Sequence, residues 1–168
     1  MITKQNIRLL SQDELKPFFL NIGEKVFRAK QVYEWLWKKS AQSFDDMTNL
    51  SKQTREQLKE HFSIPAVKIK SSQTSSDRTI KNAFELADGN IVEGVLIPAP
   101  DRMTACISSQ VGCSLTCKFC ATGKLKRLRN IRFDEILDQV VHIKKQAEQN
   151  YNSPLTNIVY MGMGEPLL

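Results

Sequence analysis

Three cysteines follow one another at a C-x3-C-x2-C spacing in this chain of 168 residues: Cys113, Cys117 and Cys120. A closed zinc site takes four ligands, usually as two C-x2-C pairs, whereas an iron–sulfur cubane held by three thiolates keeps one iron open. Cys106 could complete a four-cysteine zinc site through an unusual C-x6-C pair, so a zinc-ribbon binding module is an alternative. The spacing favours an iron–sulfur cluster on a short loop.

Composition and charge point to a reduced protein that could bind nucleic acid. The N-terminal sequence has no apolar stretch with a cleavage site, so we expect a cytoplasmic protein without structural disulfides. No apolar run is long enough for a membrane span. Lys and Arg outnumber Asp and Glu by 24 to 18, a net charge of +6. Basic residues gather in and after the cysteine loop, where they could grip phosphates or form an ordinary solvated face: Lys118, Lys124, Lys126, Arg127, Arg129 and Arg132.

Residues 1–65 are predicted to form a small helical domain. Ser11-Gln-Asp-Glu14 resembles a capping box ahead of a helix. Apolar residues at helical spacing indicate a second helix over residues 27–39 and a third over about residues 51–62. From there the pattern changes to alternation, so we expect a β-hairpin segment in residues 66–100.

The expected elements of the second part combine hairpins with a βαβ unit. In residues 66–100 we expect strands at 67–70, 79–86 and 91–97, a turn at 88–89 and a mobile loop at 71–77. In residues 101–168 we expect a strand at 104–108, the cysteine loop, a helix at 133–149 and a strand at 156–161. The helix should turn Phe133, Ile136, Val140 and Ala147 inward. A βαβ unit favours a parallel sheet with ligand-bearing loops at the carboxyl ends of its strands.

A second motif lies downstream of the cysteine loop. It reads Gly162-Met-Gly164-Glu165-Pro166, and taken alone it is commonly an ordinary turn. Together with Phe119 directly before the last loop cysteine, it resembles the radical S-adenosylmethionine (SAM) superfamily. The flanks, residues 106–113 and 161–168, are similar to those of the RlmN/Cfr-type RNA adenine methyltransferases.

The resemblance implies a 4Fe-4S cluster on the three loop cysteines, with SAM bound at the open iron. It places Phe119 near the adenine of SAM, and Gly164 and Glu165 at the methionine amino group. Cys106 stands where the family has a cysteine that forms a transient disulfide bond to release product, and Glu93 where it has a proton-abstracting carboxylate. Their alternatives are a small buried residue and a solvent-facing strand residue.

The implied reaction is methylation of C2 of an adenosine in 23S rRNA, and in a wider reading in tRNA, through a methyl-cysteine intermediate. This is a role in rRNA and tRNA processing, with a flavodoxin or ferredoxin as electron donor. Methylation at C8 is an alternative within the family. A non-catalytic RNA- or metal-binding remnant is the alternative outside it.

The fold class that we expect is α/β, or α+β overall: the helical domain, the hairpin segment, and then the start of a partial (β/α)6 barrel. A βαβ unit needs roughly 30 or more residues, so residues 101–168 hold two strands and one helix of such a barrel. We therefore expect an N-terminal fragment without the C-terminal half of the barrel and its methyl-carrying cysteine.

Overall fold

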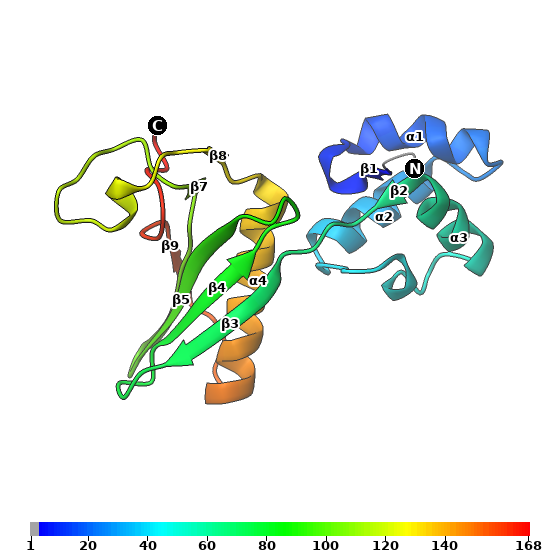
Figure 1. The fold of residues 1–168 in the computed structure, drawn as a ribbon. Coiled ribbons are helices and arrows are strands. Elements are labelled where there is room, and N and C mark those ends of the chain that lie inside the picture. Colours follow the sequence, from blue (N-terminus) through cyan, green and yellow to red (C-terminus); the bar gives the residue numbers. More distant parts are fainter. Residues whose placement is uncertain (1–3) are drawn as a thin grey trace. The chain divides into compact units, whose positions relative to one another are not determined.

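A computed structural model describes residues 4–168, and the contacts within the chain divide it into two compact units. The first unit ends at Pro65, and the second runs from Ala66 to Leu168. Each has an apolar core of its own. Figure 1 traces the chain through both units. Within the described residues, no helix is long and apolar enough to cross a membrane.

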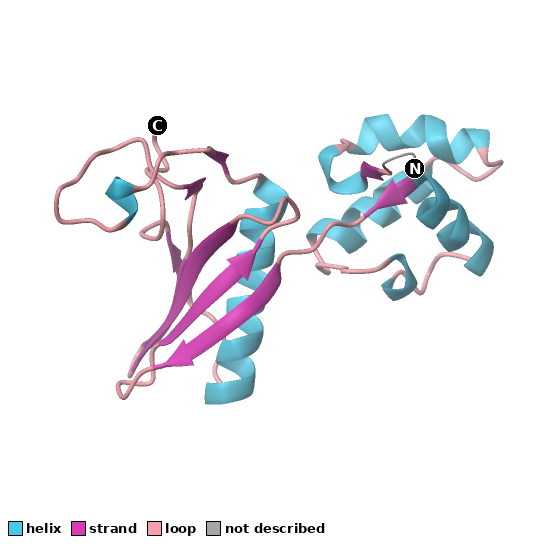
Figure 2. Cartoon of the chain, viewed as in Figure 1, coloured by secondary structure: helices cyan, strands magenta, loops and turns pink. Residues whose placement is uncertain are grey.

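The first unit is helical, as Figure 2 shows in cyan. The three helices expected from the sequence are confirmed, although α2 ends two residues before the predicted position. Its elements are β1 (Gln5–Asn6), η1 (Ile7–Leu9), α1 (Gln12–Asn21), α2 (Phe27–Trp37), η2 (Phe44–Asp46), α3 (Lys52–His61) and β2 (Phe62–Ser63). The two short strands pair in parallel.

Capping residues explain where these helices begin. The hydroxyl of Ser11 accepts a hydrogen bond from the Glu14 N–H at 3.2 Å, and the Glu14 carboxylate accepts one from the Ser11 N–H at 2.7 Å. This reciprocal pair is the predicted capping box. Ser51 caps α3 by accepting from the Thr54 N–H at 3.1 Å. Gly23 follows α1 with a φ of 75°, a conformation that favours glycine.

The second unit is built on one five-stranded sheet in the order β3-β4-β5-β6-β9. Its strands are β3 (Lys68–Thr74), β4 (Ile80–Glu85), β5 (Ile91–Ala99), β6 (Arg102–Cys106) and β9 (Asn157–Val159). β3 to β6 pair antiparallel, and β9 joins β6 in parallel. The hairpin segment and the βαβ unit therefore share a single sheet. The remaining elements are β7 (Gln110–Val111), η3 (Thr122–Lys124), β8 (Arg129–Asn130) and α4 (Phe133–Tyr151).

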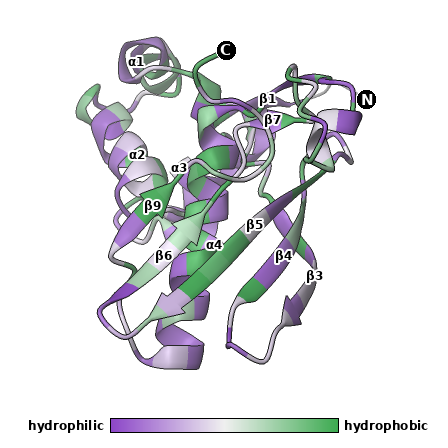
Figure 3. Ribbon diagram, turned by 90° about the vertical axis from the view of Figure 1, so that its left-hand side faces the viewer, coloured by the Kyte–Doolittle hydropathy of each residue, from purple (hydrophilic) through white to green (hydrophobic). Residues whose placement is uncertain are grey.

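One face of this sheet packs against α4, which contacts β5 and β6. The register places Phe84 opposite Val92 and Leu96 opposite Ala105, and all four side chains are fully buried. Because strand side chains alternate, the residues between them face the other side of the sheet. Figure 3 shows hydrophobic and hydrophilic stretches alternating along α4, as an amphipathic helix requires.

Two expectations for this unit are wrong. Residues 71–74, predicted as a mobile loop, continue β3, which has a register shift between Ile69 and Ser71. Every residue of this edge strand is exposed, so its sequence lacks an apolar alternation. Phe133, predicted to face inward, is 56% exposed, while the neighbouring Asp134 and Glu135 are buried. Arginines compensate these two carboxylates, so charge replaces the expected apolar contact at the start of α4.

Candidate functional site

The cysteine loop is closed at its base by backbone contacts. β7 pairs antiparallel with β8, and Cys113 forms a β-bridge with Lys126. Gly112 has a φ of 78°, and a Cβ there would lie 2.3 Å from the carbonyl oxygen of Lys126. Only glycine permits this approach, so the backbone segments at the two ends of the loop lie in direct contact.

A tight turn within the loop holds its second and third cysteines. The Cys120 N–H donates to the carbonyl oxygen of Cys117 at 3.1 Å, and the Gly123 N–H donates to that of Cys120 at 3.1 Å. A Cβ on Gly123 would lie 2.8 Å from the Cys117 carbonyl oxygen. The backbone therefore folds closely around Gly123, directly before η3 ends.

The three loop cysteines share one cavity of about 150 Å³ with residues 162–165, the Gly-x-Gly-Glu segment. Figure 1 shows the red C-terminal segment beside the yellow-green cysteine loop. The cavity is lined by Cys113, Leu115, Cys117, Phe119, Cys120, Thr122, Gly123, Gly162, Gly164 and Glu165. Two motifs that α4 and β9 separate in the sequence thus meet at one place.

The thiols around this cavity are suitable metal ligands by their chemistry. Backbone N–H groups of Gly123 and Thr122 lower the pKa of the Cys120 thiol, and the Leu115 N–H donates to the Cys113 sulfur at 3.4 Å. A thiolate is the form of cysteine that binds metal. Within residues 4–168, no three His, Cys, Asp or Glu side chains are already grouped tightly enough for a metal ion. The donor set, three thiols on one cavity, fits a cluster with an open iron.

The Gly-x-Gly-Glu segment follows β9 and turns back toward β7. Gly164 has a φ of 99°, which a residue with a side chain rarely adopts. Glu165 is half-buried, and its carboxylate accepts a hydrogen bond of 3.3 Å from the Leu167 N–H. The carboxylate therefore reaches the cavity from a structured turn.

Cys106, at the end of β6, is 8% exposed and lies opposite Val95 of β5. Burial raises the pKa of its thiol, although the backbone N–H of Met161 hydrogen-bonds the sulfur and lowers it in part. All four cysteines are free thiols, so the disulfide bond implied by the resemblance is not found within the described chain. Cys106 is held as a buried neutral thiol.

Glu93 lies on β5, on the same face of the sheet as Cys106, because it is two residues from Val95. Its carboxylate forms an ion pair of 2.7 Å with Lys81 of β4, and its side chain is 49% exposed. Within the described residues, Glu93 is therefore placed as a half-exposed strand residue with a lysine partner. Phe119 is 95% exposed at the rim of the cavity.

The basic residues after the cysteines divide into two groups. Arg129 and Arg132, expected with the others on a basic face, pair instead with carboxylates at the start of α4. Lys124, Lys126 and Arg127 are exposed, and no hydrogen bond or ion pair engages their side chains in the described part of the chain. They line a second cavity, of about 450 Å³, together with Cys113, Ser114, Thr116, Gly123 and Leu125.

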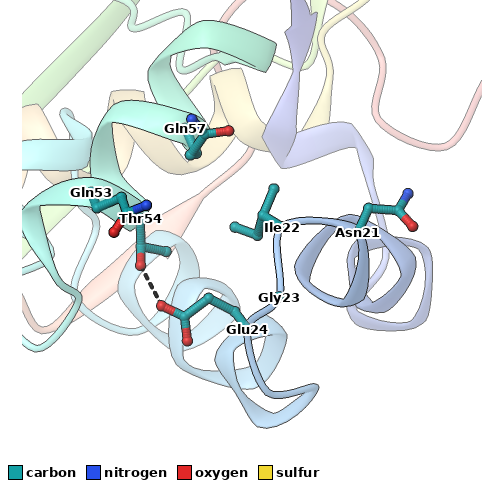
Figure 4. A pocket seen from close by; sticks show the side chains of 7 residues that line it. All are labelled: Asn21, Ile22, Gly23, Glu24, Gln53, Thr54 and Gln57. Carbon is teal, nitrogen blue, oxygen red and sulfur yellow. Dashed lines mark hydrogen bonds between the residues drawn. The ribbon is translucent and has the colours of Figure 1, made fainter.

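A separate cavity of about 420 Å³ lies in the first unit. Figure 4 shows its lining residues, with Glu24 hydrogen-bonded to Thr54. The Thr54 hydroxyl donates to the Glu24 carboxylate at 2.6 Å and, with Arg28, lowers the pKa of Glu24 despite its partial burial. None of the site residues expected from the sequence lines this cavity.

Comparisons with known proteins agree with one another. Residues 5–64 match the family described as Ribosomal RNA large subunit methyltransferase N-terminal domain. The chain is 66% identical over 167 residues to the Probable dual-specificity RNA methyltransferase RlmN of Cytophaga hutchinsonii, a match that covers 99% of this chain and 46% of that relative. It is 46% identical over 164 residues to the Dual-specificity RNA methyltransferase RlmN of Geotalea uraniireducens, which covers 98% of this chain and 46% of the relative. The chain belongs to the RlmN family.

A solved structure agrees with this assignment to the RlmN family. The crystal structure of a radical SAM methyltransferase from Sphaerobacter thermophilus matches with a TM-score of 0.80 at 36% sequence identity. The match covers 97% of this chain and 48% of that one. The fold expected from the sequence, a helical part followed by the start of a radical SAM barrel, is confirmed. The chain spans about half the length of the RlmN relatives that it matches.

Two buried residues of this RlmN-family chain were not singled out from the sequence. Ser108 is 0% exposed and Gln110 is 1% exposed, and both side chains bond the backbone of the Gly-x-Gly-Glu segment. The available signal was their position in the 106–113 flank, where polar residues directly follow an apolar strand. That signal does not reveal which distant segment they contact.

Proposed function

We propose that this chain is the N-terminal half of a radical SAM RNA methyltransferase that methylates C2 of an adenosine in 23S rRNA and in tRNA. The observation that carries the proposal is the cavity of about 150 Å³ that the three loop cysteines share with Gly164 and Glu165. The reaction class is supported by the names of the relatives, RNA methyltransferases that are 66% and 46% identical to this chain.

In this proposal Cys113, Cys117 and Cys120 hold a 4Fe-4S cluster, and Gly164 and Glu165 receive the ammonium group of SAM. When bound, the cluster supplies the electron that activates SAM. The N–H groups around Gly123 favour the thiolate of Cys120, the form needed for ligation. The exposed ring of Phe119 lies at the rim of the cavity and is available to cover the adenine of SAM.

Two further residues act on the RNA base in this proposal. Glu93 accepts the proton of the adenine ring, and its carboxylate is paired at 2.7 Å with Lys81 of β4. Cys106 acts in release of the product. Burial keeps its thiol neutral, and the Met161 N–H hydrogen-bonds its sulfur.

The substrate base has to be unstacked, because an adenine inside a duplex cannot reach an enclosed site. Lys124, Lys126 and Arg127 line a cavity that also contains Cys113, so free cations lie next to the proposed metal centre. Such cations bind RNA phosphates irrespective of sequence. In this proposal the substrates are ribosomal and transfer RNA, and the electron donor is a flavodoxin or ferredoxin. We therefore expect the reaction in the cytoplasm.

The decisive experiment is electron paramagnetic resonance (EPR) on anaerobically reconstituted, dithionite-reduced protein, with and without SAM. We expect a 4Fe-4S signal that shifts on addition of SAM. Cys117→Ala should lose the signal, whereas Cys106→Ala, a matched change outside the loop, should keep it. Bound zinc without iron would indicate the zinc-ribbon alternative, and a cluster that does not respond to SAM would indicate a non-catalytic remnant.

The position of methylation needs a second measurement. Mass spectrometry of nucleosides from RNA treated with the enzyme separates 2-methyladenosine from 8-methyladenosine. The RlmN names of the relatives favour the first product. The second would assign the protein to the C8 branch of the family.

A further inference from the structure

Ser108 joins the strand before the cysteine loop to the Gly-x-Gly-Glu segment. Its hydroxyl donates to the carbonyl oxygen of Glu93 at 2.6 Å and accepts from the Met163 N–H at 2.8 Å. The Met163 carbonyl oxygen in turn accepts from the N–H groups of Ser109 at 2.9 Å and Gln110 at 3.1 Å. With Ser108 fully buried, these bonds are shielded from water and fix the segment against β5 and β7.

Gln110 holds the next part of the same segment. Its Oε1 accepts from the backbone N–H of Glu165 at 3.2 Å, and its Nε2 donates to Asn130 Oδ1 at 3.1 Å and to the Leu168 carbonyl oxygen at 3.0 Å. A side-chain amide offers two donors and an acceptor oxygen, and here both ends are engaged. A buried amide paired in this way has one defined orientation, which fixes the Glu165 N–H.

The glycines show how closely the two segments approach. A Cβ on Gly162 would lie 2.7 Å from the Ser108 hydroxyl, and one on Gly164 would lie 2.5 Å from the Cβ of Gln110. These separations are too short for carbon atoms in ordinary contact. The backbone of the segment therefore lies directly on Ser108 and Gln110.

We propose that Ser108 and Gln110 are positioning residues for SAM, which hold the backbone of Gly164 and Glu165 so that the Glu165 carboxylate stays at the cavity of the loop cysteines. The inference rests on the proposed function of that cavity. Neither residue lines the cavity, so both act through the segment that does. Losing the Gln110 contact allows the Glu165 turn to move, and a carboxylate displaced by even 1 Å binds an ammonium group poorly.

The test uses two substitutions of Gln110 in the reconstituted protein. Gln110→Met keeps a similar volume and removes the amide, whereas Gln110→Glu keeps an oxygen that can accept from the Glu165 N–H. Gln146→Met is the matched control, because this half-buried glutamine lies on α4 and pairs with Asn82 at 2.8 Å. Iron and sulfide content and the EPR signal without SAM report the cluster. The SAM concentration that half-saturates the EPR shift reports positioning.

For Gln110→Met we expect an intact cluster and half-saturation at about tenfold higher SAM concentration, equivalent to about 1.4 kcal/mol, because of the three hydrogen bonds lost the one to the Glu165 N–H bears on SAM. Gln110→Glu keeps the acceptor for the Glu165 N–H but loses both donors and buries a charge, so it should recover only part of this loss, and Gln146→Met should match the wild type. A Gln110→Met protein that binds SAM like the wild type overturns the proposal. Loss of the cluster itself in that variant also overturns it, because a residue that only positions SAM leaves the cluster in place.

Two further outcomes are distinguishable. If the wild-type protein has no cluster, or has a cluster that does not respond to SAM, the proposed function itself is refuted. If only the Gln110 variants behave against expectation, the positioning role is refuted and the proposed function is not. If Gln110→Met does not fold, Ser108→Ala decides. An intact cluster with a raised SAM half-saturation in that variant supports the proposal, and a wild-type half-saturation overturns it.

Discussion

Arg129 holds the buried carboxylate of Glu135 with both of its Nη atoms, at 2.8 and 3.0 Å. The side chain of Glu135 is 2% exposed, and the same guanidinium donates from Nε to Asp88 at 2.7 Å. The hydrogen bond from Arg129 to Glu135 is the main cause that raises the pKa of Arg129. Arg132 also reaches Glu135, at 3.2 Å. The fork of Arg129 thus joins the β4–β5 turn, the end of the cysteine loop and the start of α4.

Replacing Arg129 by Met should destabilise the second unit. Removing one partner of a buried ion pair costs about 3 to 5 kcal/mol, and we expect the low end because Arg132 still contacts Glu135. Arg127→Met is the control, because no ion pair holds this exposed side chain within the described part of the chain. The free energy of unfolding in urea is the measurement. Equal midpoints and slopes for the two variants would contradict a structural role of Arg129.

Local signals in the sequence were sufficient for most of the fold. Ser11 with Glu14 predicted the start of α1, and Asp88-Gly89 predicted the β4–β5 turn, where Gly89 has a φ of 80°. The polar residues of β3 gave no such signal, because an exposed edge strand is defined by its pairing with β4. The buried Glu135 was equally hidden, since an acidic residue at the start of a helix ordinarily faces water.

The site likewise combines features with a local sequence signal and features that depend on contacts between distant segments. The cysteine spacing and the Gly-x-Gly-Glu segment could be recognised because each is a compact sequence motif. The ion pair between Lys81 and Glu93 depends on strand register, and the contact of Gln110 with Glu165 depends on how the two loops meet. Neither relationship is encoded at a fixed sequence separation, so only the structure reveals them.

Lys124, Lys126 and Arg127 should contribute to RNA binding through phosphate contacts. Replacing all three with Ala should weaken binding to an RNA hairpin with an unpaired adenosine and reduce the salt slope of log K by about 2, since each lost single-strand phosphate contact removes about 0.7. Fluorescence anisotropy at several salt concentrations measures both quantities. The control replaces two exposed lysines of α4, Lys144 and Lys145, with Ala. An unchanged slope in the triple variant would exclude this surface.

Gly164→Ala should disrupt the Gly-x-Gly-Glu segment. The added Cβ meets Gln110 at 2.5 Å and forces a side chain onto a φ of 99°. Gly89→Ala is a matched control, because Gly89 has a φ of 80° but no atom within 4 Å of its added Cβ. Strain alone costs about 1 to 2 kcal/mol, so both variants lose that stability in urea unfolding. Only Gly164→Ala should also lose the EPR shift with SAM. If Gly89→Ala lost the EPR shift to the same extent, the clash with Gln110 would not be its cause.

Cys106 should ionise at a higher pH in the folded protein than in the unfolded chain, because burial raises the pKa of its thiol. The thiolate is the form that reacts with iodoacetamide, so the pH midpoint of alkylation reports ionisation separately from the slower access to a buried group. A protein whose three loop cysteines are replaced by Ser leaves Cys106 as the single reacting thiol. Alkylation is followed by mass spectrometry, in native buffer and in urea, from about pH 7 to about pH 11, a range chosen to span the ordinary thiol pKa of about 8.5.

The same shift makes stability depend on pH with a definite sign. Between the unfolded and the folded pKa, the unfolded chain has released a proton that folded Cys106 still holds, so the free energy of unfolding falls as pH rises through this window. It should be constant at lower pH as far as Cys106 is concerned. Cys106→Ala removes this contribution, and the difference in unfolding free energy between the two proteins should therefore change with pH only in the alkaline range. Identical alkylation midpoints in native buffer and in urea would show that the surroundings of Cys106 do not keep its thiol neutral.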